Sequence, residues 1–164
     1  MKKNYLSGFS LPELLIVLTI MGILFSLTGI NLLGAYGKNT LSTTISTLQA
    51  DLKQQQLKAM VGDTEGQPSP NDFGIYFPAA GLTYILFQGN SFSETNPTNF
   101  SVNLNDDLQF TSIFVKDSQI IYAKGSGEFS NYENNLDYVT LRNINTDETK
   151  TIRFNQFGTV INIY

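Results

Sequence analysis

Hydrophobic and polar positions change their period along the chain. Apolar residues dominate from residue 9 to about residue 33, and from residue 41 to residue 59 they return at helical spacing. After residue 71 apolar and polar positions alternate, as in strands that bury one face. This order predicts a long N-terminal helix followed by a β-rich region.

The second half of the predicted helix is amphipathic. Its apolar stripe is formed by five residues at helical spacing: Leu41, Ile45, Leu48, Leu52 and Ala59. Four polar residues are expected largely off this stripe: Gln49, Lys53, Gln56 and Lys58. The stripe favours packing against the chain's own β region, and a groove for a partner helix is the weaker alternative. Residues 62–71, which contain two Gly and two Pro, end the helix.

Segments rich in β-branched and aromatic residues predict the strands. They are 73–77, 83–88, 108–116, 119–124, 138–142, 151–155 and 159–164, with a further short strand at 100–104. Turns are expected at 79–81 and 156–158, where glycine follows the preceding strand. The predicted fold class is α+β, a long N-terminal helix packed on an antiparallel sheet or on two sheets.

The first half of the helix has the length of a membrane span. About 20 apolar residues suffice to cross a bilayer, and the run from residue 9 is longer than the apolar core of a cleavable secretory signal. Lys2 and Lys3 precede it, so the positive-inside rule places the N-terminus in the cytoplasm and the rest of the chain outside. The pattern predicts a single-pass anchor.

Composition excludes several classes of chemistry. The chain has no cysteine and no histidine, which removes disulfide scaffolds, thiolate nucleophiles and the usual zinc ligands. No candidate catalytic residue stands out, so we expect no enzyme, no cofactor and no small-molecule substrate. The net charge of −4 and the pI near 4.6 disfavour nucleic acid as a main partner.

Two loops are candidate ligand sites. Oxygen-bearing residues at 103–107 include Asp106 and Asp107 and suit Ca²⁺ in type, but their spacing does not match a known loop, so a solvated loop is favoured. The turn at 155–158 contains no Arg or Lys, which disfavours a DNA-binding loop there. Residues 125–128 are interpreted as a turn.

One acid stands out within the apolar run. Glu13 is the only charged residue between residues 9 and 37, and a buried carboxylate needs a partner or it becomes neutral. An amine from a second subunit is one such partner. Alternatively, Ser10 and Glu13 form a capping box, with Pro12 in the first helical turn. Glu13 can both cap the helix and pair with an amine if one role follows the other.

Residues 8–17, Gly-Phe-Ser-Leu-Pro-Glu-Leu-Leu-Ile-Val, resemble the start of a type IV prepilin or a type II secretion pseudopilin. The resemblance implies that a prepilin peptidase cuts between Gly8 and Phe9 and that Phe9 is then N-methylated. It also implies that Glu13, the fifth residue of the mature chain, pairs with the N-terminal amine of a neighbouring subunit. The expected segments are a leader at 1–8, a transmembrane helix at 9–37, an amphipathic helix at 38–62 and a β domain at 63–164.

The architecture is similar to that of small minor pseudopilins and minor type IV pilins. The chain departs from many pilins in having Ile30 where they carry a proline, and it lacks a C-terminal cysteine pair and the Trp-containing calcium loop of major pseudopilins. The resemblance implies a structural subunit of a pilus or pseudopilus in the bacterial cytoplasmic membrane, serving type II secretion, a type IV pilus or a competence pilus. Its partners would be other subunits, the peptidase and membrane lipid. The alternative is an anchored module on a pilus that binds DNA or glycan.

Overall fold

The computed structural model describes residues 10–164, with side chains at 10–26 and 40–164. Contacts between Cα atoms divide the chain into two compact units, residues 1–36 and residues 37–164. The helix α1, Leu11–Val61, contributes to both units.

A glycine motif ends α1. Gly62 follows the last helical residue with a φ of 67°, a conformation that glycine adopts without steric strain. The Gly62 N–H donates to the carbonyl of Ala59 at 3.2 Å, and the Asp63 N–H donates to that of Lys58 at 3.0 Å. These two bonds form a Schellman motif, which satisfies carbonyls that the last turn leaves open. The helix therefore ends at Val61, and Gly62 is the first residue of the segment 62–71 that was expected to stop it.

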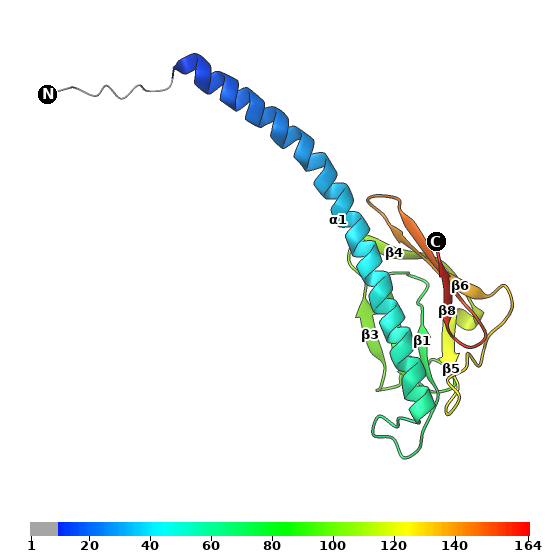
Figure 1. Cartoon of the computed structure of the whole chain (residues 1–164). Coiled ribbons are helices and arrows are strands. Elements are labelled where there is room, and N and C mark those ends of the chain that lie inside the picture. Colours follow the sequence, from blue (N-terminus) through cyan, green and yellow to red (C-terminus); the bar gives the residue numbers. More distant parts are fainter. Residues whose placement is uncertain (1–9) are drawn as a thin grey trace. The chain divides into compact units, whose positions relative to one another are not determined.

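The second unit contains two antiparallel sheets in the described chain (Figure 1). The strands are β1 (Phe73–Tyr76), β2 (Thr83–Gln88), β3 (Phe100–Asn103), β4 (Leu108–Val115), β5 (Gln119–Tyr122), β6 (Asp137–Asn143), β7 (Thr149–Phe154) and β8 (Val160–Ile163). Sheet A has the order β3-β2-β1-β5, and sheet B has the order β4-β6-β7-β8. Every predicted strand segment is confirmed, and the α+β class with two sheets holds.

The chain changes sheets three times between its two meanders. After β1, β2 and β3 it enters sheet B at β4, returns to sheet A at β5 beside β1, and ends with β6, β7 and β8. A short 3₁₀ turn, η1 (Lys116–Ser118), makes the return, with Asp117 and Ser118 at φ values of 53° and 55°. The consecutive strands β4 and β5 belong to different sheets. Sheet A therefore gains its last strand, β5, after the chain has formed β4 in sheet B, and sheet B gains β6, β7 and β8 after the chain has formed β5 in sheet A.

The amphipathic stripe of α1 packs into this unit. Leu41, Leu48 and Ala59 are 0% exposed, and Leu52 and Ile45 are only 2% and 4% exposed. They share one hydrophobic cluster with residues of both sheets. Packing against the chain's own β region is therefore confirmed for this stripe. Burial of such side chains is the main stabilising term of a core, at about 1.5–3 kcal/mol each.

The expectation that Gln56 lies off the stripe was wrong. Gln56 is 8% exposed, because its place one turn after Leu52 turns it toward the core. Its Nε2 donates to the carbonyls of Gly127 at 2.9 Å and Phe157 at 2.8 Å, and its Oε1 accepts from Lys53 Nζ at 3.1 Å. The amide thereby joins the helix to the turn at 125–128 and to the β7–β8 turn, both of which were predicted.

Replacing Gln56 by Leu is expected to lower the free energy of unfolding by about 2 kcal/mol, because two backbone carbonyls lose their donor. Urea unfolding of the full chain in detergent measures this effect. Gln54→Leu is the matched control, since Gln54 is exposed on the same helix and should change stability by less than about 0.5 kcal/mol. Equal effects of the two substitutions would contradict a role for the Gln56 bonds.

Candidate assembly site

Glu13 is positioned by the first turn of α1. Ser10 immediately precedes the helix, and both its backbone N–H and its Oγ donate to Glu13 Oε2, at 2.9 and 2.8 Å. The Ser10 carbonyl accepts the first intrahelical bond from the Leu14 N–H at 3.2 Å. Glu13 therefore caps the start of the helix by accepting from the Ser10 N–H, which is one of the two bonds of a capping box. Both Ser10 bonds use Oε2, so Ser10 leaves the second carboxylate oxygen, Oε1, unengaged.

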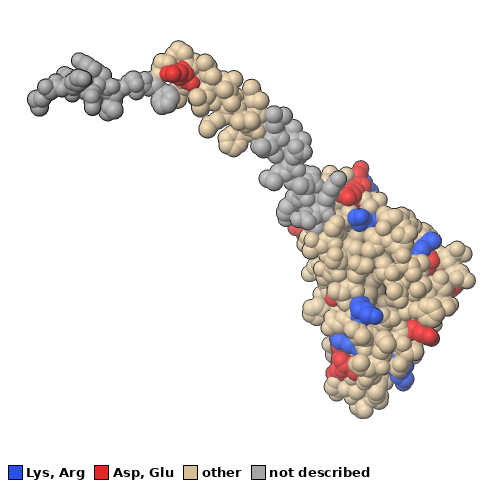
Figure 2. Space-filling view, in the orientation of Figure 1, with Lys and Arg blue, Asp and Glu red and all other residues tan. Residues whose placement is uncertain are grey.

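The first part of α1, residues 11–26, exposes apolar side chains on all its sides. Large apolar side chains here are 47–75% exposed: Leu11, Leu14, Leu15, Ile16, Val17, Leu18, Ile20, Met21 and Ile23. Figure 2 shows this stretch with acidic atoms at its start and otherwise no charged groups. A helix that is hydrophobic all round is stable only when apolar surroundings cover it. Within its own unit, this segment therefore presents surface for lipid or for other helices.

Other parts of the predicted N-terminal site lie outside the described residues. These are Gly8, Phe9 and the side chains of residues 27–37. Among the described residues, no helix combines the length and the apolar character that a membrane span requires.

The comparisons with known proteins concern this same N-terminal region. A family model described as the prokaryotic N-terminal methylation motif matches residues 4–29, which include Gly8, Phe9 and Glu13. The chain carries the N-terminal signal of type IV pilins and pseudopilins. The resemblance of residues 8–17 to this signal is thereby confirmed. Comparisons with curated proteins and with solved structures found no match for the chain.

The candidate Ca²⁺ loop at 103–107 lies far in sequence from the signal at 4–29. Asp107 Oδ2 accepts a hydrogen bond from Asn143 Nδ2 at 3.0 Å, while Asp106 is exposed. Among the residues that the structure describes, no three His, Cys, Asp or Glu side chains form a group suited to a metal ion. Asp107 therefore belongs to a side-chain pair that links the start of β4 to the end of β6.

The β7–β8 turn is held by its own first residue. Asn155 Oδ1 accepts from the backbone N–H groups of Phe157 and Thr159, both at 3.0 Å. Both arginines of sheet B lie beside acids: Arg142 forms an ion pair with Asp147, and Arg153 Nε lies 3.5 Å from Asp137 Oδ1. These contacts reduce the positive charge available to a phosphate backbone.

Gln55 was not singled out from the sequence. It is 2% exposed, although it is polar. Its position three residues after Leu52 and four before Ala59 continues the apolar stripe, and that spacing is the signal that predicts its burial.

Proposed function

We propose that this protein is a structural subunit of a pilus or pseudopilus, exported and assembled through its N-terminal hydrophobic helix after cleavage by a prepilin peptidase. The observation that carries the proposal is the methylation motif at residues 4–29. It coincides with a helix that exposes apolar side chains all round and bears one acid in its first turn. Type II secretion, type IV pili and competence pili are the machineries in which such a subunit would serve.

Residues 9–37 anchor the subunit in the bacterial cytoplasmic membrane before assembly, with the β unit outside. The peptidase then removes residues 1–8 and leaves a new amine on Phe9. In the filament the Glu13 carboxylate pairs with the Phe9 amine of a neighbouring subunit. Fixing register is the best-attested use of a buried ion pair.

The Ser10 cap supports this sequence of events. By donating twice to Oε2, Ser10 holds the Glu13 carboxylate at the start of the helix before any neighbour arrives. A carboxylate that already accepts hydrogen bonds is less costly to place in apolar surroundings than a bare one. The incoming amine then meets a positioned acceptor, and capping and assembly become successive roles of one residue.

Processing at the bond between Gly8 and Phe9 is the direct test. We expect mass spectrometry of the membrane-extracted protein, coexpressed with a prepilin peptidase, to show Phe9 as the N-terminal residue with one added methyl group. Protein from cells that lack the peptidase is the control and should keep its leader. A chain that retains residues 1–8 in the presence of active peptidase would contradict the proposed function.

A further inference from the structure

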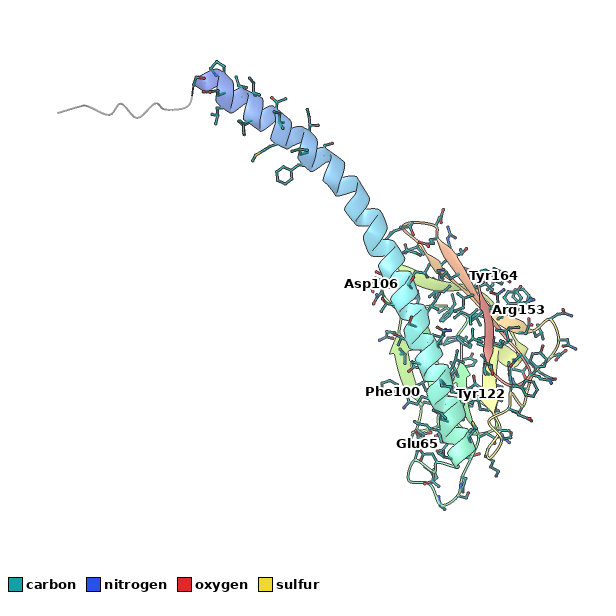
Figure 3. The ribbon with its side chains drawn as sticks, in the orientation of Figure 1. Glu65, Phe100, Asp106, Tyr122, Arg153 and Tyr164 are labelled. Carbon is teal, nitrogen blue, oxygen red and sulfur yellow. The ribbon has the colours of Figure 1, made fainter. Side chains whose placement is uncertain are left out.

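A cavity of about 330 Å³ lies between α1 and the edge of sheet A in the second unit. The helix contributes Asp51, Gln55 and Lys58 to its lining, and β3 contributes Phe100 and Val102. In Figure 3 the labelled Phe100 and Glu65, which both line this cavity, lie beside the C-terminal half of α1. The wall on the helix side is polar and the wall on the strand side is apolar.

Gln55, which lines this cavity, has a side-chain oxygen that needs a hydrogen-bond donor. Its side chain is 2% exposed, yet within the described chain Oε1 has no hydrogen-bond partner. Buried amide oxygens are nearly always paired, because an unpaired one loses its bond to water without replacement. A ligand that brings an N–H group into the cavity would satisfy it.

Asp51 makes the net charge of the cavity lining negative. It lies one helical turn before Gln55, and its Oδ2 accepts from the Tyr84 hydroxyl at 2.5 Å. Burial and this bond raise the pKa of Tyr84, so the hydroxyl stays a donor. Among the described residues Asp51 forms no ion pair, whereas Lys58 is paired with Glu65. The uncompensated charge in the cavity is therefore negative.

The strand wall of the cavity is an open sheet edge. Within the described residues, β3 pairs with β2 alone. The Leu104 N–H donates to the Leu82 carbonyl at 3.0 Å, and the alternation of an antiparallel ladder then turns the backbone groups of Ser101 and Asn103 away from β2. Both residues are exposed, and in the described chain no other backbone segment bonds to them. Such an edge accepts an additional strand.

We propose that β3 and this cavity bind an extended basic segment of another polypeptide by strand addition, with a Lys or Arg side chain seated between Asp51 and Gln55. Main-chain bonds to Ser101 and Asn103 would supply part of the affinity, and every second side chain would point to the face that carries Phe100 and Val102. The cation complements Asp51 and donates to Gln55 Oε1, while its aliphatic stem contacts the apolar wall. The site is independent of the N-terminal signal.

Amide spectra of the ¹⁵N-labelled full chain in detergent micelles test this proposal. The probe is a blocked peptide in which Thr and Lys alternate, the matched control peptide alternates Thr and Glu, and n-butylamine supplies the free cation. We expect the Lys peptide to shift the amide signals of Ser101 and Asn103 and the side-chain amide of Gln55. Its affinity should exceed that of the Glu peptide by at least about tenfold, since the charge pairs in one complex and repels in the other.

Two substitutions separate the two parts of the site. Ser101→Pro removes an outward N–H without changing the β2 pairing and should weaken the Lys peptide about fivefold or more, whereas Ser101→Ala keeps the N–H and should stay within about twofold. Asp51→Asn retains an acceptor for Tyr84 but loses the charge, and about tenfold weaker binding is expected. A dispersed spectrum of each variant establishes that it is folded.

Three results would overturn the proposal. Unchanged affinity of Ser101→Pro would exclude strand addition. Shifts confined to Gln55, given equally by butylamine and by the peptide, would indicate a site for small cations. Absence of binding by every probe would leave the cavity without the proposed occupant. None of these results bears on cleavage at Gly8, so failure here is distinct from failure of the proposed function.

Discussion

Replacing Glu13 by Gln is expected to preserve membrane insertion and cleavage while removing most of the subunit from filaments. The amide still offers Ser10 an oxygen acceptor, so the helix cap persists. It cannot form an ion pair with an amine. An amine left in an apolar layer without its carboxylate costs roughly 3–5 kcal/mol, which is more than about a hundredfold in the equilibrium of incorporation.

The measurement is the ratio of filament-bound to membrane-bound subunit, normalised to membrane abundance. Ser10→Ala is the matched control, because it removes one donor of the cap and leaves the carboxylate in place. Its effect should be no more than about 1 kcal/mol on the helix start. If the Gln variant enters filaments at the wild-type ratio, Glu13 serves only as a helix cap.

The strands of the β unit could be predicted because each strand has a recognisable pattern in its own sequence. Alternation of apolar and polar residues located each strand from β1 to β8. The same alternation does not say which strands become neighbours. The return of β5 to sheet A depends on Asp117 and Ser118 in left-handed conformations. The predicted strands 108–116 and 119–124 leave these two residues between them, but neither is glycine, so residue type did not indicate the conformations that send β5 to the other sheet.

The polar residues of the helix were less predictable than the apolar ones. Leu48 and Leu52 were placed correctly, because apolar identity and helical spacing agree at those positions. At Gln55 and Gln56 the residue type and the spacing disagree, and spacing prevailed. Gln56 can be buried because carbonyls from distant turns accept its N–H groups. Such partners lie far away in sequence, so no local pattern reports them.

Leu48→Ala is expected to lower the free energy of unfolding of the β unit by about 3 kcal/mol, within the range for buried Leu-to-Ala substitutions. Leu48 is 0% exposed and belongs to the cluster that both sheets share, so truncation leaves a cavity between helix and sheets. Urea unfolding of the full chain in detergent should show a lower midpoint with an unchanged slope.

Leu57→Ala is the matched control for this loss, because it makes the same chemical change on the same helix at a side chain that is 47% exposed. It should change the unfolding free energy by less than about 0.5 kcal/mol. A similar loss at both positions would mean that the stripe does not pack as described. Glu13→Gln should leave the unfolding free energy of the β unit unchanged, since Glu13 belongs to the other compact unit. Loss of stability at Leu48 and loss of incorporation at Glu13 are therefore separable: the first reports the core of residues 37–164, and the second reports the pairing of subunits.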